Sequence, residues 1–254
     1  MKVRAPIFYF HRVASDNLEA AVPAEVFAEH LRHWRELGAQ SVSLEQIARH
    51  LEGGGSPLPP RAINISFDDC YADLLDRALP LLDEFGFQAS FFAVAGHLGG
   101  KSFWSQGPAR ELELMSADHL RQLAAHGHEI GSHGFHHRSL TWLPLDELWA
   151  ELADSRQVLE QVLGRPVAAL AYPFGDVAPW VAEAANAAGY LTARGLRRGN
   201  LHSRQSLFDL SVINSMRLRD RVSRGKMAHY LGPWFEWGAR KEAIGRRWQR
   251  RQTM

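Results

Sequence analysis

Two groups of side chains in the sequence have the types and the spacing that bind a metal ion. Asp68 and Asp69 are adjacent carboxylates that follow an apolar run, and His133 and His137 lie four residues apart. Like charges this close must be held by a cation, a proton or hydrogen bonds. Two imidazoles at this spacing can face one ion from a helical turn or a tight loop. With one of the carboxylates they make a two-histidine, one-carboxylate set with open coordination positions, so the predicted site is catalytic and not structural.

The surrounding pattern predicts strands and helices in alternation. Short apolar runs predict strands at residues 6–11, 62–67, 89–95, 129–132, 168–172 and 190–194. Helical periodicity with capping, proline or glycine signals predicts helices at residues 23–38, 44–53, 71–85, 116–127, 145–163 and 179–188. Repeated strand–helix units imply a parallel sheet that is open or closed into a barrel.

Polar residues follow several of these predicted strands. His11, Asp68 with Asp69, His133 and the turn at residues 172–175 each come directly after an apolar run. The carboxyl ends of parallel strands meet at one face, where the active sites of such folds lie. We therefore expect these residues to share one site.

Composition sets broad limits on the function and the location. The chain has 254 residues, 46% of them hydrophobic, which is enough for one sizeable core. Its 29 basic and 28 acidic residues nearly cancel, which argues against a general polyanion-binding surface. Cys70 is the single cysteine, and the apolar stretch at residues 5–10 is too short for a signal-peptide core, so we expect a cytoplasmic protein.

Three segments resemble the motifs of the polysaccharide deacetylases with NodB homology. Residues 65–71, Ile-Ser-Phe-Asp-Asp-Cys-Tyr, resemble the first motif, Thr-Phe-Asp-Asp-Gly-Tyr. Residues 133–137, His-Gly-Phe-His-His, with Leu140 beyond them, resemble the second, His-Ser/Thr-x-x-His followed by a leucine. Residues 171–175, Ala-Tyr-Pro-Phe-Gly, are similar to the third, Arg-Pro-Pro-Tyr-Gly. The resemblance extends from residue 7 to about residue 215.

The resemblance implies a fold, a reaction and a role for each motif residue. The fold would be an irregular (β/α) barrel of about seven strands. The reaction would be the hydrolysis of the N-acetyl group of an amino sugar in a glycan or glycolipid, with release of acetate. Asp69, His133 and His137 would hold one divalent metal, usually zinc, and Asp68 would be the general base. The expected substrate-binding residues are Tyr71, Tyr172, Pro173 and Phe174.

Three positions depart from the family motifs. Cys70 replaces a glycine, and we interpret it as a tolerated small residue and not as a catalytic thiol. Gly134 replaces a serine or threonine whose hydroxyl normally braces the loop. Ala171 replaces the arginine that normally orients the base. The sequence does not choose a substitute from the available arginines, which are Arg12, Arg194, Arg197 and Arg198.

The general acid needs a further histidine. The last family motif, an apolar strand that ends in a catalytic histidine, is not evident in the C-terminal third. Residues 8–11, Phe-Tyr-Phe-His, have that pattern near the N-terminus, as in the poly-N-acetylglucosamine deacetylase branch. First and last strands are neighbours in a closed barrel, so His11 is the candidate. The alternatives are His202 as the acid, or a structural role for His11. We expect the other histidines of the same region, His126, His128 and His136, to face solvent or form hydrogen bonds.

The C-terminal segment, residues 226–254, differs from the expected catalytic domain at residues 1–225. It combines aromatic with basic residues: Tyr230, Trp234, Phe235, Trp237 and Trp248 with Arg240, Lys241, Arg246, Arg247, Arg250 and Arg251. This composition is typical either of a packing helix with a solvated basic end or of a peripheral contact with an anionic membrane. No nucleic-acid recognition motif accompanies the charge.

Two other functions stay open at this point. A metal amidohydrolase that acts on a non-sugar amide would use the same constellation of residues. A non-catalytic glycan- or membrane-binding protein would keep the fold, and the absent motif arginine favours it slightly. The intact set of Asp68, Asp69, His133 and His137 favours an enzyme over it.

Overall fold

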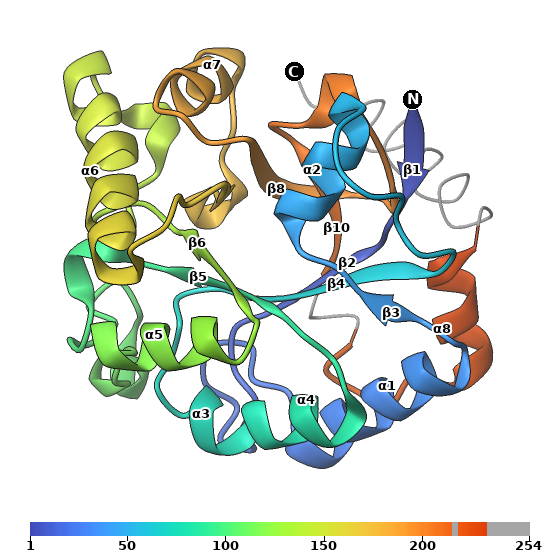
Figure 1. Ribbon diagram of the computed structural model, residues 1–254. Helices are drawn as coiled ribbons and strands as arrows, with labels where there is room; N and C mark the ends of the chain where they lie inside the picture. Colours follow the sequence, from blue (N-terminus) through green and yellow to red (C-terminus); the bar gives the residue numbers. More distant parts are fainter. Residues whose placement is uncertain (215–217, 233–254) are drawn as a thin grey trace, which may run out of the picture.

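Parallel strands form a closed barrel at the centre of the protein (Figure 1). The computed structural model describes residues 1–214 and 218–232. Within these residues the barrel has seven strands, and it closes because β2 pairs with both β10 and β4. Around the barrel the order is β2 (Ile7–Phe10), β10 (Leu210–Asn214), β8 (Thr192–Arg198), β7 (Ala169–Ala171), β6 (Glu129–Ser132), β5 (Ser90–Ala93) and β4 (Ala62–Phe67). The prediction of a (β/α) barrel with about seven strands is confirmed.

Helices surround the barrel, and several of them begin and end at the capping residues that the sequence analysis identified. They are α1 (Ala24–Glu36), α2 (Leu44–Glu52), α3 (Leu74–Arg77), α4 (Leu79–Phe85), α5 (Ala117–Ala125), α6 (Leu145–Leu163), α7 (Pro179–Ala187) and α8 (Arg224–Leu231). Ser43 and Ser116 precede α2 and α5, and each side chain accepts a hydrogen bond from a backbone N–H of the first turn. Gly53 and Gly164 end α2 and α6 with φ values of 89° and 66°. Glycine adopts this left-handed conformation without the steric cost that other residues have.

Side chains alternate between the inside and the outside of the barrel. On β2, Ile7 and Tyr9 belong to the cluster inside the barrel, whereas Phe8 and Phe10 belong to the layer beneath the helices. In that outer layer Trp34 of α1 packs on Phe8 with ring centroids 4.6 Å apart. Strands with both faces buried read as continuous apolar runs, which is the pattern of residues 7–10.

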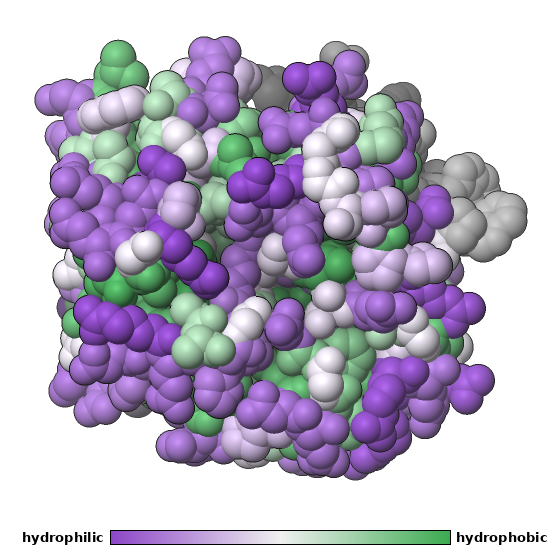
Figure 2. Space-filling model, in the orientation of Figure 1, coloured by the Kyte–Doolittle hydropathy of each residue, from purple (hydrophilic) through white to green (hydrophobic). Residues whose placement is uncertain are grey.

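Helix α2 closes the end of the barrel at which the strands begin. Its apolar residues pack in one cluster with the inward-facing residues of the strands: Leu44, Ile47, Ala48 and Leu51. Glu129, the first residue of β6, accepts hydrogen bonds from the N–H groups of Leu44 and Glu45 at 2.8 and 2.9 Å. Burial raises the pKa of Glu129, and the partial positive charge at the start of the helix offsets part of that effect. Figure 2 shows a mostly hydrophilic face on the side where α2 lies in Figure 1.

One predicted helix is wrong in its extent. Residues 71–85 do not form a single helix but α3 and α4, which are interrupted at Ala78. Pro80 explains the interruption, because proline has no N–H to donate and its ring crowds the preceding turn. Tyr71 lies before α3, in an isolated bridge with Leu114.

Four short strands have no counterpart among the predicted elements. β10 closes the barrel between β8 and β2. β3 (Gln40–Ser41) extends the sheet beside β4, while β1 (Lys2–Arg4) and β9 (Leu201–Ser203) form a separate antiparallel pair. Strands of two to five residues give too few positions for a clear alternation of apolar and polar side chains.

The expected boundary between residues 225 and 226 falls within α8. Met227 and Tyr230 of this helix are buried, and the Tyr230 ring lies 6.2 Å from that of Phe8. The aromatic and basic residues from 233 onward lie outside the described residues, so the membrane contact stays a prediction. Within the described residues no helix is both long and apolar enough to span a membrane.

We expect Ile47→Ala to destabilise the protein, because the Ile47 side chain is fully buried between α2 and the barrel interior. Truncating a buried isoleucine typically costs about 2–5 kcal/mol in the free energy of unfolding. Urea denaturation followed by circular dichroism measures this loss. The control is Glu52→Ala on the exposed end of α2, with an expected change below about 0.5 kcal/mol. Equal stability of both variants and the wild type would show that α2 is not part of the core.

Candidate active site

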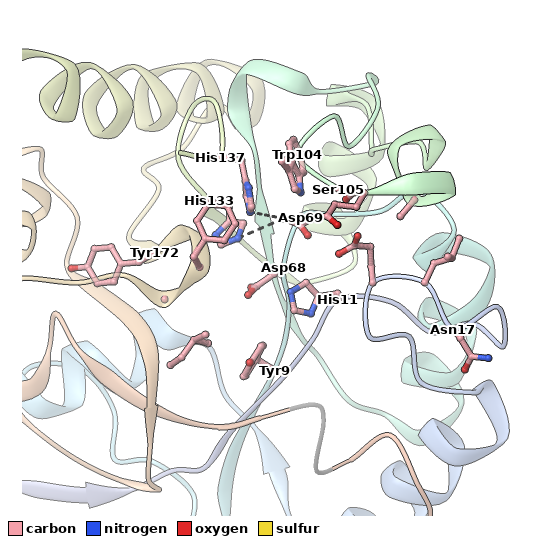
Figure 3. A pocket seen from close by; sticks show the side chains of 17 residues that line it. Tyr9, His11, Asn17, Asp68, Asp69, Trp104, Ser105, His133, His137 and Tyr172 are labelled. Atoms are coloured by element: carbon pink, nitrogen blue, oxygen red, sulfur yellow. Dashed lines mark ion pairs between the residues drawn. The ribbon is translucent and has the colours of Figure 1, made fainter. Parts of the chain in front are cut away.

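A cavity opens at the end of the barrel where the strands finish. Its volume is about 440 Å³, within the range of roughly 300–1,000 Å³ that is usual for small-molecule sites. His11 follows β2, Asp68 and Asp69 follow β4, and His133 follows β6, and all four line this cavity together with His137 (Figure 3). The structure thus brings together the residues that the sequence placed after separate strands.

Asp69, His133 and His137 converge on one point of the cavity. The Asp69 Oδ1 atom lies 3.2 Å from His137 Nε2 and 3.6 Å from His133 Nε2. One ligand atom from each of the three residues lies within 4.8 Å of the others. Asp69 Oδ1 is buried, and apart from these imidazoles no described group lies close enough to be its partner. Two imidazole nitrogens and one carboxylate oxygen fit a divalent metal with open positions toward the cavity.

Neighbouring groups orient His133 and shift the pKa values of His133 and Asp69 toward the states that bind a metal. The Nδ1 atom of His133 lies 2.7 Å from the Ala171 carbonyl oxygen and donates to it, which leaves the Nε2 lone pair toward the site. Burial lowers the pKa of His133 to about 4, so its imidazole is neutral at neutral pH. Burial would raise the pKa of Asp69, but the hydrogen bond and the charge of His137, with the charges of His133 and His11, outweigh it and hold that pKa below its usual value. Both shifts favour the protonation states that bind metals.

Aromatic rings fix the second histidine. The His137 ring stacks on Trp104 with centroids 4.4 Å apart and an angle of 22° between the planes. The Phe174 ring also packs on His137, and the two ring centroids are 4.7 Å apart. His137 has a φ of 56°, which is unusual for a residue with a side chain, so this packing holds it in a conformation that the backbone alone disfavours.

Glu151 of α6 braces the loop that carries both histidines. Its buried carboxylate accepts hydrogen bonds from the N–H groups of Phe135 and His136 at 2.8 and 2.9 Å, and its Oε1 atom lies 2.8 Å from His136 Nδ1. A Cβ atom at Gly134 would lie 3.3 Å from Glu151 Oε2. The carboxylate therefore occupies the space beside the position where the family carries a hydroxyl, and it supplies a brace of its own.

Arg194 pairs with Asp68. A guanidinium nitrogen of Arg194 donates to Asp68 Oδ1, and both side chains are buried. The guanidinium also lies over the rings of Tyr9 and Phe92, 5.2 and 4.8 Å from their centroids. Arg194 on β8 is the direct partner of Ala171 on β7 in the strand register. The arginine that the third motif lacks is thus present one strand away.

The other arginines that the sequence left open have partners elsewhere. Arg12 binds Asp16 and Asp73, and Arg197 binds Asp209. Arg194 alone among the four forms an ion pair with Asp68 in the part of the chain that the structure describes.

The two candidates for the general acid lie in different places. His11 lines the cavity, and its Nδ1 atom is buried with no hydrogen-bond partner among residues 1–214 and 218–232. His202 lies on β9, with its Nε2 atom 2.8 Å from the Ala5 carbonyl oxygen, and does not line the cavity. This placement supports His11.

The expected substrate-binding residues separate into two pairs. Tyr172 and Phe174 line the cavity, and the Phe174 side chain is exposed. Tyr71 and Pro173 are buried and do not line it, and the Tyr71 hydroxyl lies 3.3 Å from Ser105 Oγ. Their contribution to substrate binding stays a prediction.

The remaining residues of interest have local roles. Cys70 is buried, and burial together with the charges of Asp69 and Asp68 raises the pKa of its thiol well above the usual value. This keeps the thiol protonated and argues against catalysis by a thiolate. His126 is exposed, and the Nδ1 atom of the buried His128 accepts a hydrogen bond from the N–H of Ala89.

Sequence reasoning missed several residues of the cavity wall. They are Tyr9, Asn17, Leu18, Glu19, Trp104, Ser105, Gln106, Ala109 and Leu196. Most of them lie on loops, where no periodicity marks a functional position. Tyr9 alone could have been found from the sequence, because its position on the first predicted strand faces the interior of the barrel.

Comparisons with known proteins agree on one family. The family profile "Polysaccharide deacetylase" matches residues 55–193, more than half of the chain. The Bacillus subtilis protein YxkH, named as a candidate polysaccharide deacetylase, is 24% identical over 92% of this chain and 76% of its own length. A poly-beta-1,6-N-acetyl-D-glucosamine N-deacetylase of Staphylococcus aureus is 21% identical over 66% of this chain. The chain spans 58% of that relative's length, and the Escherichia coli protein of the same name is matched over 12% of its length.

Solved structures share the fold over nearly the whole chain. The deacetylase PplD of Streptococcus pyogenes, solved with acetate, superposes with a TM-score of 0.77 and 22% identity, over 92% of this chain and 100% of that one. IcaB from Ammonifex degensii superposes with a TM-score of 0.74 and 21% identity, over 90% of this chain and 97% of that one.

Asp69→Ala should abolish metal binding, because Asp69 supplies the only carboxylate oxygen of the ligand group found among the described residues. Metal content after dialysis against zinc, measured by elemental analysis, should fall from about one ion per chain to background. Asp83→Ala on the exposed side of α4 is the matched control and should keep the ion. Full occupancy in Asp69→Ala would place the metal elsewhere.

Glu151→Gln should weaken metal binding without removing a ligand, because a neutral amide holds the two loop N–H groups less firmly. Losing such an outer partner typically lowers metal affinity about 10–100-fold. Titration with cobalt(II), followed by its visible absorption, measures both the affinity and the ligand geometry. Asp154→Asn, exposed on the same helix, should behave like the wild type. An unchanged cobalt affinity in Glu151→Gln would mean that the loop keeps its shape without the carboxylate.

Proposed function

Because the chain belongs to the polysaccharide deacetylase family, we propose that it hydrolyses the N-acetyl group of an amino sugar in a glycan or glycolipid and releases acetate. One observation carries this proposal: Asp68, Asp69, His11, His133 and His137 all line a single cavity at the end of the barrel. The names of the S. aureus and E. coli relatives support N-acetylglucosamine as the sugar.

The proposed reaction needs a Lewis acid and two proton transfers. Asp69, His133 and His137 would hold a divalent metal, for which we propose zinc, and the chemistry it would supply is polarisation of the amide carbonyl and a lowered pKa of a water molecule. Asp68 accepts a proton from the water that attacks the carbonyl carbon, while Arg194 fixes the position of its carboxylate.

His11 completes the reaction on the leaving side. It donates a proton to the amide nitrogen as the bond between carbon and nitrogen breaks, and the amine then takes up the second proton of the attacking water, so the products are acetate and an ammonium group on the sugar. Tyr172, Phe174, Trp104 and Leu196 supply apolar walls around the reacting group. Such surfaces suit the apolar faces of a sugar ring and exclude water from the reaction.

The assay that tests the proposal is acetate release, with and without a chelator, from three substrate classes. These are N-acetylglucosamine oligosaccharides, lipid-linked N-acetylated sugars and small non-sugar acetamides. Release from a glycan or glycolipid that stops on chelation is the expected result. Release from the acetamides alone would favour the non-sugar amidohydrolase, and no release from any class would favour a binding protein. The cytoplasmic location is not tested by this assay and stays a prediction.

Asp68→Asn and His11→Ala should each keep the metal and lose turnover, because neither side chain belongs to the ligand group. General acid and base catalysis typically contribute about 10²–10⁴-fold each. The measurements are kcat for acetate release and metal content of the same sample. A kcat near wild type in Asp68→Asn would move the base to another residue, and the same result in His11→Ala would leave His11 a structural role.

A further inference from the structure

The loop between β2 and α1 forms a wall of the cavity and belongs to no family motif quoted above. Asn17, Leu18 and Glu19 line the cavity on the side of His11, and Figure 3 shows Asn17 on the far side of His11 from the metal ligands. These residues lie ten to twelve positions after the start of β2 in the chain, and they belong to no strand or helix. Their position therefore depends on contacts of the loop itself.

The loop has an unusual backbone conformation. Asn17, Glu19 and Ala20 have φ values of 62°, 48° and 51°. Non-glycine residues rarely adopt this conformation, and those that do gather at functional sites. The other non-glycine residues with positive φ in the described chain are Asp69, Cys70, His137 and Phe174. Every member of both groups lines the cavity or is a direct neighbour in sequence of a residue that does.

A buried arginine holds the loop in this conformation. Arg12 is 2% exposed, and its two terminal nitrogens each lie 2.9 Å from a carboxylate oxygen of Asp16. One of these nitrogens also lies 2.5 Å from Asp73 Oδ2 at the start of α3. Val13 and Val22 form a bridge across the base of the loop. The wall is therefore preorganised before a substrate arrives.

The Glu19 carboxylate on this wall has no hydrogen-bond or ion-pair partner among the described residues. Asp68 pairs with Arg194, and Asp69 faces two imidazoles, but no hydrogen bond or ion pair of the Glu19 carboxylate exists within residues 1–214 and 218–232. An N-acetylated sugar is neutral and needs no such charge. The cation that the proposed reaction itself creates on a glycan is the ammonium group of a deacetylated unit.

We propose that Glu19 binds the ammonium group of a glucosamine unit next to the N-acetylated unit that reacts. The inference rests on the proposed function, and it makes a partly deacetylated chain the preferred substrate. A charged hydrogen bond between carboxylate and ammonium is stronger than the neutral bonds that sugar hydroxyls offer. Each turnover then produces the group that favours binding of the neighbouring unit.

The test compares two kinds of trisaccharide on the zinc-loaded protein. One is N-acetylated on all units, and the other is a pair of isomers with a free amine on one side of an N-acetylated middle unit. For the wild type we expect kcat/KM to be about tenfold higher for at least one isomer, which corresponds to one charged hydrogen bond. In Glu19→Gln this ratio should fall to about one, and in Glu19→Lys below one. Glu52→Gln, exposed on α2, should keep the wild-type ratio.

A wild-type ratio of one overturns the proposal, and so does a tenfold ratio that persists in Glu19→Gln. An equal loss on both kinds of substrate assigns Glu19 to hydroxyl binding and also overturns it. A second measurement separates this failure from failure of the proposed function, because it needs no turnover. Calorimetric binding of the fully deacetylated trisaccharide should be about tenfold weaker in Glu19→Gln than in the wild type, and the difference should shrink with salt. Absence of that difference overturns the proposal even where acetate is released.

Discussion

Two adjacent carboxylates are buried at the end of β4, and the rest of the site follows from the need to stabilise both. Asp68 and Asp69 are 4% and 3% exposed, so water compensates little of their charge. The left-handed backbone at Asp69 and Cys70 turns the chain sharply at this point, and the two side chains have different partners. Asp68 has the guanidinium of Arg194, and Asp69 has the two imidazoles with the metal they would share. In the proposed reaction, one carboxylate would thereby be left for proton transfer while its neighbour would bind the ion.

The departures from the family motifs are compensated by residues that lie close in space but far apart in the chain. Glu151 lies on α6, after the loop it braces, and Arg194 lies on the strand next to the one where the motif arginine would be. Both substitutes are charged side chains from a neighbouring helix or strand, whereas the family motifs place the corresponding groups on the loop or strand itself. The chemistry therefore depends on which group occupies a position in space, and the element that carries it can change.

Much of the fold and part of the site could be predicted from the sequence, and the limits have physical causes. Strands such as β4 and β6 and helices such as α2 and α6 were found with nearly their observed bounds, because they combine regular periodicity with capping residues. β10 was missed because five residues give a weak pattern, and the helix over residues 71–85 was extended across a proline. The candidate metal-binding triad could be predicted because His133 and His137 are close in the sequence and, with Asp69, match the family motifs, whereas the Arg194–Asp68 pair joins residues 126 positions apart. Loop residues such as Glu19 and Trp104 are placed by tertiary contacts that no local pattern records.

Because α2 packs into the end of the barrel where the strands begin, substrate and products would enter and leave through the cavity opening at the other end. In the proposed reaction acetate would form beside Asp68 and Asp69, and the glycan would lie across the opening of the cavity, whose wall includes residues 17–19 and Phe174. With α2 packed at the opposite end of the barrel, acetate would leave through the opening that the glycan occupies. Release of acetate would then require the glycan to move, and a chain that slides by one sugar would open the cavity and present its next unit in the same step.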